Sequence, residues 1–186
     1  SRDGIEWERV LDRQTFLSLG KEGGWEDGMV RITQNFIVVG DEIYLYYGGV
    51  QGAHTGRKFA TVERTEQPML GLATLRRDGF ASGEAGDEEG FLLTQPLAIE
   101  GETLHVNAEC RGGLRVEVTD DAGGPLEGYA AALGAGNYLD ATLDFAATLD
   151  FARPLADLQG RQVRLRISLQ RANLYSYWFA QAQPTI

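Results

Sequence analysis

The segment "GGWEDGMV" (residues 23–30) places an aromatic ring beside two carboxylates. An indole face can cover the apolar C–H face of a pyranose, while carboxylates accept hydrogen bonds from its hydroxyls. Trp25, Glu26 and Asp27 are therefore candidates for contacting a sugar. An acidic turn before a strand is the competing interpretation, because exposed Asp and Glu are common at such turns.

Glycoside hydrolysis needs two carboxylates, one as the acid and the other as the nucleophile or base. Glu26 and Asp27 are adjacent, and neighbours on an extended chain point to opposite sides. At most one of the two can face a common site, so this pair alone does not make a glycosidase centre.

A second group of candidates follows the phrase "IYLYYGG" (residues 43–49). Tyr47 ends an alternating strand, and the two glycines after it permit a sharp turn or a close backbone approach. His54 and Arg57 come next, and in an acidic chain they could contact a neutral sugar or a carboxylate. A solvated loop histidine is the plainer alternative.

We predict that Asp27, Tyr47 and His54 converge at one end of the N-terminal sheet. If "NFIVV" separates the strands "MVRIT" and "IYLYY", those two strands run parallel, and the start of one lies far from the end of the other. Convergence then depends on the loop of residues 48–60 folding back, for which a span of ~3.3 Å per residue is ample.

Composition argues against several other kinds of chemistry. The chain has one cysteine and two histidines, so it cannot form an internal disulfide or a cysteine-rich zinc site, and most triad chemistry is excluded. It contains no phosphate loop, dinucleotide fingerprint or nucleophile elbow, and we expect no cofactor and no bound metal. Asp120 and Asp121 are assigned to a turn, and His105 to a structural or surface role.

The formal net charge of −10 argues against nucleic acid and anionic lipid as partners. No apolar run approaches the roughly 20 residues that span a bilayer, so we expect no membrane partner. The polar start "SRDGIEWERV" does not resemble a signal peptide. The compartment stays open, with a secreted or periplasmic location as one option.

The elements that would position the candidates are predicted to be β-strands. Apolar and polar residues alternate in "LHVNAEC" (104–110), "LRVEV" (114–118) and "VRLRISL" (163–169). A period of two places the two sets on opposite faces of an antiparallel sheet. We expect one face to be buried, with Val116, Val118, Val163, Leu165, Ile167 and Leu169 in it.

Turn sequences divide this β chain. "VVGDEIYLYY" (38–47) predicts two strands joined by a Gly-Asp turn, and "VTDDAGGPL" (118–126) predicts a hairpin loop. The glycine-rich, acidic residues 79–90 indicate the start of a second unit, so we expect two parts, 1–78 and 79–186.

Two further segments carry open alternatives. The tandem hexapeptide "ATLDFAATLDFA" (141–152) is too short for a solenoid, so a lengthened hairpin or edge loop is favoured over a helical turn. In "NLYSYWFAQ" (173–181), one strand face would be core, and an exposed, flat opposite face would be a sugar platform or an interface. Strict alternation puts Tyr175, Tyr177 and Phe179 on one face and Leu174, Ser176 and Trp178 on the other.

Several phrases together resemble the last propeller blade of proteins similar to glycoside hydrolase families 32 and 43: "WEDGMV", "IVVGDEIYLYYGG", "GAH" and "GLATLRRDGF". The later phrases "LRVEVTDDAGGPLEGY" and "LQGRQVRLRISLQRANLYSYWF" resemble the β-sandwich appended to those propellers. The resemblance covers roughly residues 7–180. It implies an all-β chain in which a propeller-blade-like antiparallel sheet precedes an antiparallel, jelly-roll-like β-sandwich.

The resemblance also implies a carbohydrate-active protein, of which this chain is the C-terminal portion. One blade cannot close a ring, so the chain would not be catalytic alone. Its partners would be a glycan and the remaining propeller blades or a partner domain. A non-catalytic carbohydrate-binding module and a structural sandwich stay open as alternatives. Asp27 is the catalytic candidate, and the substrate-binding candidates are Trp25, Glu26, Tyr47, His54 and Arg57.

Overall fold

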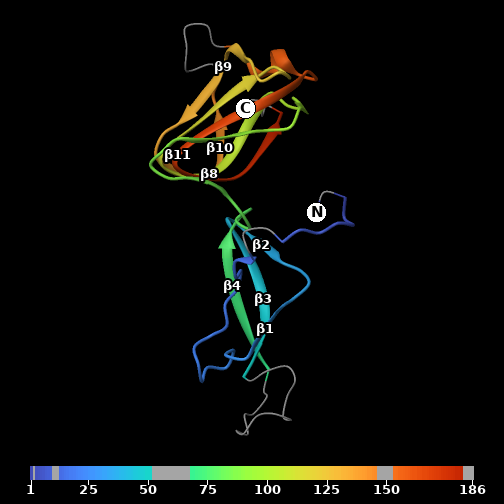
Figure 1. Cartoon of the computed structure of the whole chain (residues 1–186), viewed down its shortest axis with the longest axis vertical. Coiled ribbons are helices and arrows are strands. Elements are labelled where there is room, and N and C mark those ends of the chain that lie inside the picture. Colours follow the sequence, from blue (N-terminus) through green and yellow to red (C-terminus); the bar gives the residue numbers. More distant parts are fainter. Residues whose placement is uncertain (2, 10–12, 52–67, 146–152, 182–186) are drawn as a thin grey trace. The chain divides into compact units, whose positions relative to one another are not determined.

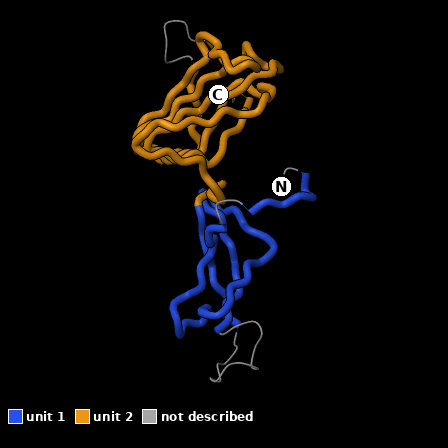
Figure 2. The backbone as a smooth tube through the Cα atoms, viewed as in Figure 1, with its two compact units in different colours: residues 1–75 blue, residues 76–186 orange. Residues whose placement is uncertain are grey.

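The computed structural model describes residues 1, 3–9, 13–51, 68–145 and 153–181. The chain divides into two compact units, residues 1–75 and 76–186 (Figure 2). Strands make up 57% of the structure, and the described residues form no α-helix, which confirms the prediction of an almost all-β chain. Among these residues, no helix has the length and apolar character that a bilayer span requires.

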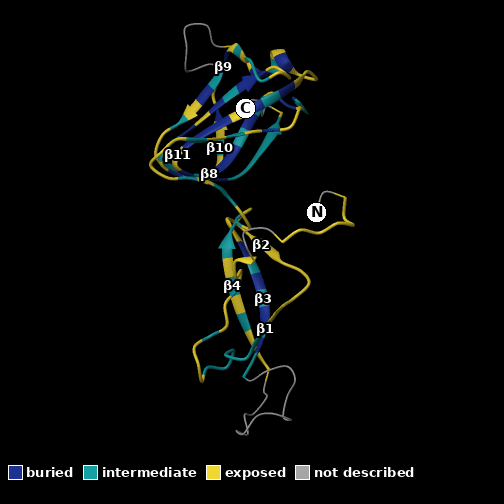
Figure 3. Ribbon diagram, viewed as in Figure 1, coloured by how far each residue is buried: buried dark blue, intermediate teal, exposed yellow. Residues whose placement is uncertain are grey.

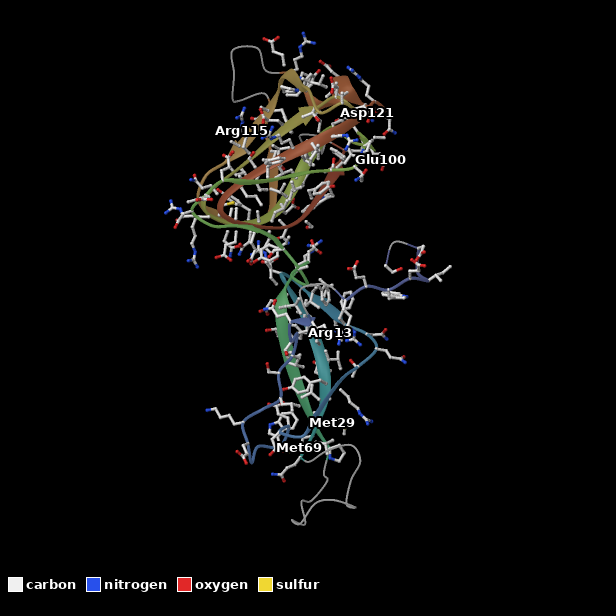
Figure 4. All side chains as sticks on the ribbon, viewed as in Figure 1. Arg13, Met29, Met69, Glu100, Arg115 and Asp121 are labelled. Atoms are coloured by element: carbon white, nitrogen blue, oxygen red, sulfur yellow. The ribbon has the colours of Figure 1, made fainter. Side chains whose placement is uncertain are left out.

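Unit 1 is a small sheet built around one long strand. Its strands are β1 (Met29–Ile32), β2 (Ile37–Val39), β3 (Glu42–Val50) and β4 (Met69–Arg76) (Figure 1). β3 pairs with all three others, and its pairings with β1 and β2 are antiparallel. Figure 4 labels Met29 and Met69, the first residues of β1 and β4.

β1 and β2 follow one another along the same edge of β3. Met29 lies opposite Val50, Ile37 lies opposite Tyr44, and the amide of Thr33 between them donates to the Tyr46 carbonyl. β4 therefore occupies the other edge. We expected "NFIVV" to lie between the strands "MVRIT" and "IYLYY", and this is wrong, because β1 pairs directly with β3. The short connection after β1 stays bonded to β3 and does not reverse the chain.

The core of unit 1 is thin. Among its described residues, the buried large hydrophobic side chains are those of Ile43, Leu45 and Tyr47, which alternate along β3. Figure 3 shows the buried stretch in β3, with β2 and much of β4 exposed. The exposed apolar residues of this sheet are Ile32, Phe36, Ile37, Val38, Val39, Met69, Leu70 and Leu72.

Unit 2 is organised by two long antiparallel strands, β8 (Thr103–Thr119) and β11 (Gln162–Ala180), which pair along nearly their whole length (Figure 1). β9 (Pro125–Leu133) and β10 (Gly136–Leu143) pair with β8. β11 pairs with β5, β6 and β7, and a short 3-10 helix, η3, precedes it. These elements are β5 (Gly83–Ala85), β6 (Gly90–Leu93), β7 (Leu97–Ala98) and η3 (Leu155–Leu158).

Alternate residues of the two long strands form one core. The whole of the predicted face is buried, with Leu165 and Ile167 fully inaccessible, so this prediction is confirmed. Residues from both halves of β8, such as Leu104 and Val118, lie in the same cluster. A single sheet that shares one core along its full length must curve on itself, as a sandwich-like fold requires. The other buried residues that alternate along β8 and the first half of β11 are Val106, Ala108, Cys110, Leu114, Val116, Val163 and Leu169.

Two irregularities interrupt the ladder between β8 and β11. At the first, Arg111 and Gly112 together lie opposite Arg171, which has a φ of 44°. At the second, Tyr175 is an extra residue on β11 between Leu174 and Ser176. Each irregularity shifts which residues of β11 face the core.

The aromatic end of β11 therefore does not alternate as the sequence predicted. Leu174 is buried before the second irregularity, and Tyr177 and Phe179 pack against the core after it. Tyr175 does not share their regular face, because the extra residue breaks the period of two.

Two local predictions fall in the loops of unit 2. Asp120 makes a turn, accepting hydrogen bonds from Gly123 N at its carbonyl and from Gly124 N at its carboxylate, 2.8 Å for the latter. The first copy of the hexapeptide runs from β10 into the core through buried Leu143 and Phe145. The second copy, residues 147–152, lies outside the described residues.

Candidate functional site

The loop before β1 lies against the end of β3. Gly24 N donates to Lys21 O at 2.8 Å, which makes a tight turn, and Gly28 N donates to Val50 O at 3.2 Å. The direct pairing of β1 with β3 brings the start of one strand to the end of the other. The loop thus delivers Trp25 and Glu26 to the β3 surface.

Glycines allow this close approach. A Cβ on Gly49 would lie 2.3 Å from the Trp25 ring and 2.7 Å from Glu26 Cβ. A Cβ on Gly71 of β4 would lie 2.3 Å from the Tyr47 ring. The glycine pair permitted either a sharp turn or a close backbone approach. Both glycines lie within β3, and Gly49 provides a close approach.

Trp25, Glu26 and Tyr47 form one cluster. The rings of Trp25 and Tyr47 are stacked, with centroids 5.8 Å apart and planes inclined by 15°. The Tyr47 hydroxyl donates a hydrogen bond to Glu26 Oε2 at 2.6 Å. This bond to the Glu26 carboxylate, together with burial, raises the pKa of Tyr47. The cluster fixes a half-buried carboxylate beside a half-buried indole.

Asp27 has a different partner from Glu26, as expected for adjacent residues. Its Oδ2 accepts a hydrogen bond from Gly23 N at 2.8 Å, and Gly23 has a φ of 82°. Gln51 Nε2 donates to the carbonyl of the same glycine at 3.2 Å. Asp27 thereby stabilises the loop that presents Trp25. Gln51 helps to hold this loop, although no sequence pattern pointed to that residue.

The predicted site residues are only partly placed by the structure. Trp25, Glu26 and Tyr47 come together, and Asp27 follows in the same loop at the same end of the sheet. His54 and Arg57 lie outside the described residues, so the convergence of His54 with Asp27 and Tyr47 and the binding role of Arg57 stay predictions. Among the residues that are described, no group of three or more His, Cys, Asp and Glu side chains could hold a metal ion.

The aromatic residues at the end of β11 are engaged within unit 2. The Trp178 ring stacks on His105, with centroids 5.5 Å apart, and the Arg76 guanidinium lies 4.8 Å from the Tyr175 ring centroid. His105 Nδ1 is 2.5 Å from Asp140 Oδ1, which gives this histidine a local structural contact. Trp178 and Tyr175 are both half-buried and form no flat, exposed platform.

Comparisons with known proteins returned no match for this chain among protein-family models, curated proteins or solved structures.

Proposed function

We propose that the chain is part of a carbohydrate-active protein and that unit 1 contributes a sugar-contacting surface, with the sandwich-like unit as an accessory. The observation that supports this proposal best is the Glu26 carboxylate held 2.6 Å from the Tyr47 hydroxyl, beside the stacked Trp25 ring. An aromatic face next to a fixed hydrogen-bond acceptor suits the mixed apolar and hydroxylated surface of a sugar.

The two carboxylate oxygens of Glu26 differ in their partners. The Tyr47 hydroxyl uses Oε2, and Oε1 makes no hydrogen bond to another residue that the structure describes. Because Tyr47 already orients the carboxylate, a sugar hydroxyl bonded to Oε1 would not have to order it. Trp25, whose ring stacks on Tyr47, is half-buried, so the fold does not cover this residue completely.

The proposed role of this chain is binding and not catalysis by itself. Hydrolysis requires two carboxylates across one glycosidic bond, at roughly 5–5.5 Å or 6.5–9.5 Å from one another. Asp27 bonds to Gly23 N in the presenting loop, while Glu26 bonds to Tyr47. A catalytic role for Asp27 would need a second carboxylate from another part of the protein, such as further propeller blades.

The surface of unit 1 supports a covering partner. Leu70 is 71% exposed and Ile37 is 52% exposed, although both belong to strands of the sheet. Exposed apolar side chains on several strands of one small sheet are typical of a surface that another domain covers. We propose further blades or a partner domain as the covering element.

A structural role for unit 2 is the second candidate. Trp178 and Tyr175 were the aromatic residues from which a sugar platform on the sandwich would be built, and each packs on a residue of its own unit. This arrangement favours a sandwich that supports its neighbour over one that binds glycan through β11.

Isothermal titration with neutral oligosaccharides tests the proposal. We expect the parent to bind, Trp25→Ala to lose measurable binding, and Glu26→Gln to bind about tenfold or more weakly, since hydrogen bonds to charged groups contribute about 1.5–3 kcal/mol. Trp7→Ala is the matched control, because Trp7 is 79% exposed and belongs to the N-terminal segment. A parent that binds no neutral oligosaccharide, or a Trp25→Ala variant that binds like the parent, would overturn it.

A further inference from the structure

A polar hollow lies on unit 2, where β5, β8 and β11 meet. Its volume is about 470 Å³, and its polar lining comes from Asp87, Glu109, Arg111, Arg171 and Asn173. Small-molecule sites typically have volumes of about 300–1,000 Å³. All of the lining belongs to unit 2, so the hollow is separate from the residues of the proposed sugar surface.

The first irregularity of the long ladder shapes this hollow. Arg111 and Gly112 lie opposite Arg171, and a Cβ on Gly112 would lie 2.4 Å from the Gln170 carbonyl oxygen. Arg171 N donates to Gly86 O at 2.7 Å, and Gln170 Nε2 donates to Asp87 O at 2.9 Å. The backbone at residues 86–87 is thus tied to β11, which makes the wall a fixed part of the fold.

The first irregularity places two exposed arginines on neighbouring strands. Arg111 lies on β8 and Arg171 on β11 at this irregularity, and both line the hollow. Arg171 also has a left-handed backbone, which non-glycine residues rarely adopt. Neither guanidinium makes an ion pair or hydrogen bond to another side chain that the structure describes. An anion in the hollow would give the donors of both a charged acceptor.

The rest of the lining offers hydrogen-bond acceptors beside this positive pair. Glu109 and Asn173 are direct cross-strand partners, and Asp87 comes from the loop after β5. The two carboxylates balance the two guanidinium charges, so the hollow is locally neutral in a chain with a net charge of −10. A ligand that carries a carboxylate together with hydroxyl or ammonium groups would match both halves of the lining.

We propose that this hollow binds a small carboxylate. Arg111 and Arg171 hold the carboxylate group, while Glu109, Asp87 and Asn173 bind its hydroxyl or ammonium groups. Sugar acids and amino acids share this chemistry, and a small monoanion avoids the repulsion that a polyanion would meet from the rest of the acidic chain.

Titration calorimetry on the full chain tests the proposal, with glucuronate, glycine and glucose as separate ligands. We expect glucuronate or glycine to bind. Any heat from glucose, a neutral sugar that the surface of unit 1 could take, should be unchanged by Arg111→Gln. Binding of glucuronate alone identifies a sugar acid, and binding of glycine alone identifies an amino acid. We expect the affinity for the carboxylate to fall with added salt, because the contact is ionic.

Variants connect the binding to the two arginines. Arg111→Gln and Arg171→Gly should each weaken binding at least tenfold, and glycine at position 171 can adopt the observed backbone without strain. Arg166→Gln is the matched control, since its guanidinium lies 4.3 Å from the Phe91 ring centroid and does not line the hollow. A parent that binds neither carboxylate, or Arg111→Gln and Arg171→Gly variants that both bind like the parent while melting normally, would overturn the proposal.

Discussion

At the scale of single residues, the Tyr47–Glu26 hydrogen bond links the presenting loop to the centre of unit 1. Removing the hydroxyl in Tyr47→Phe should lower the free energy of unfolding of this unit by about 1–2 kcal/mol, because the carboxylate loses a well-placed donor. Urea unfolding measures the change. Tyr46→Phe, one position along the same strand and half-buried, should change it by less than about 0.5 kcal/mol. Equal effects of the two substitutions would contradict the assigned role of the bond.

The same pair predicts a pH dependence. Because the pKa of Tyr47 is raised in the folded chain, the folded state holds its proton more tightly than the unfolded state. Its contribution to stability is fully present below the ordinary tyrosine pKa of about 10 and is lost as the pH rises through the folded pKa. We expect the fall in unfolding free energy between neutral pH and pH values above about 10 to be smaller in Tyr47→Phe than in the parent. An identical fall in both proteins would show that other groups cause it.

Arg76 provides another residue-scale prediction, in unit 2. Its guanidinium donates to Asn107 Oδ1 at 2.6 Å and to the Tyr138 carbonyl at 2.6 Å, and Asn107 is fully buried. Arg76→Lys keeps the charge but cannot reproduce this fork of donors. It should lower the free energy of unfolding of unit 2 by about 1–3 kcal/mol, measured in urea. The exposed Arg153→Lys should have no measurable effect.

At the scale of the elements, the middle of β11 should be the most sensitive part of unit 2. Leu165→Ala removes a side chain that is 0% exposed and should lower the free energy of unfolding by about 2–5 kcal/mol in urea. The exposed Gln162→Ala in the same strand serves as its control and should change it by less than about 0.5 kcal/mol. A Leu165→Ala value within the error of the control would contradict the assignment of the core.

The long strands show which features the sequence could predict. A strict period of two identified the buried faces of residues 104–110 and 163–169, because side chains on a regular strand must alternate. The irregularities at Arg171 and Tyr175 left no such signal. Each depends on how β11 is matched to β8, and pairing partners do not follow from the pattern of either strand alone.

In the candidate site too, the sequence predicted the residues that take part but not the strand pairing that brings them together. Residue types selected Trp25, Glu26 and Tyr47, and the glycine pair indicated a close approach near them. The predicted order of strands failed, because four residues between β1 and β2 could equally have formed a reversal or, as observed, an interruption along one edge of β3. The contact of Gly71 with Tyr47 was not predictable, since it depends on β4 pairing with β3.

At the scale of the whole molecule, the two units should differ in stability. The described part of unit 1 buries three large hydrophobic residues, whereas unit 2 has one continuous core. Units with separate cores can unfold in separate steps, and a small core supports less stability. We expect two transitions in urea, with Tyr47→Phe moving only the earlier and Leu165→Ala only the later. A single transition moved equally by both would show that the units unfold together.

The sole cysteine lies within the second of these cores. Cys110 is 4% exposed, and burial, with a contribution from the Glu109 carboxylate, raises the pKa of its thiol. Thiolate is the form that alkylating reagents attack, so the native chain should react very slowly. Each labelled molecule would then record an opening of the β8–β11 core, and timed exposure to iodoacetamide would give the opening rate of that core without any engineered probe.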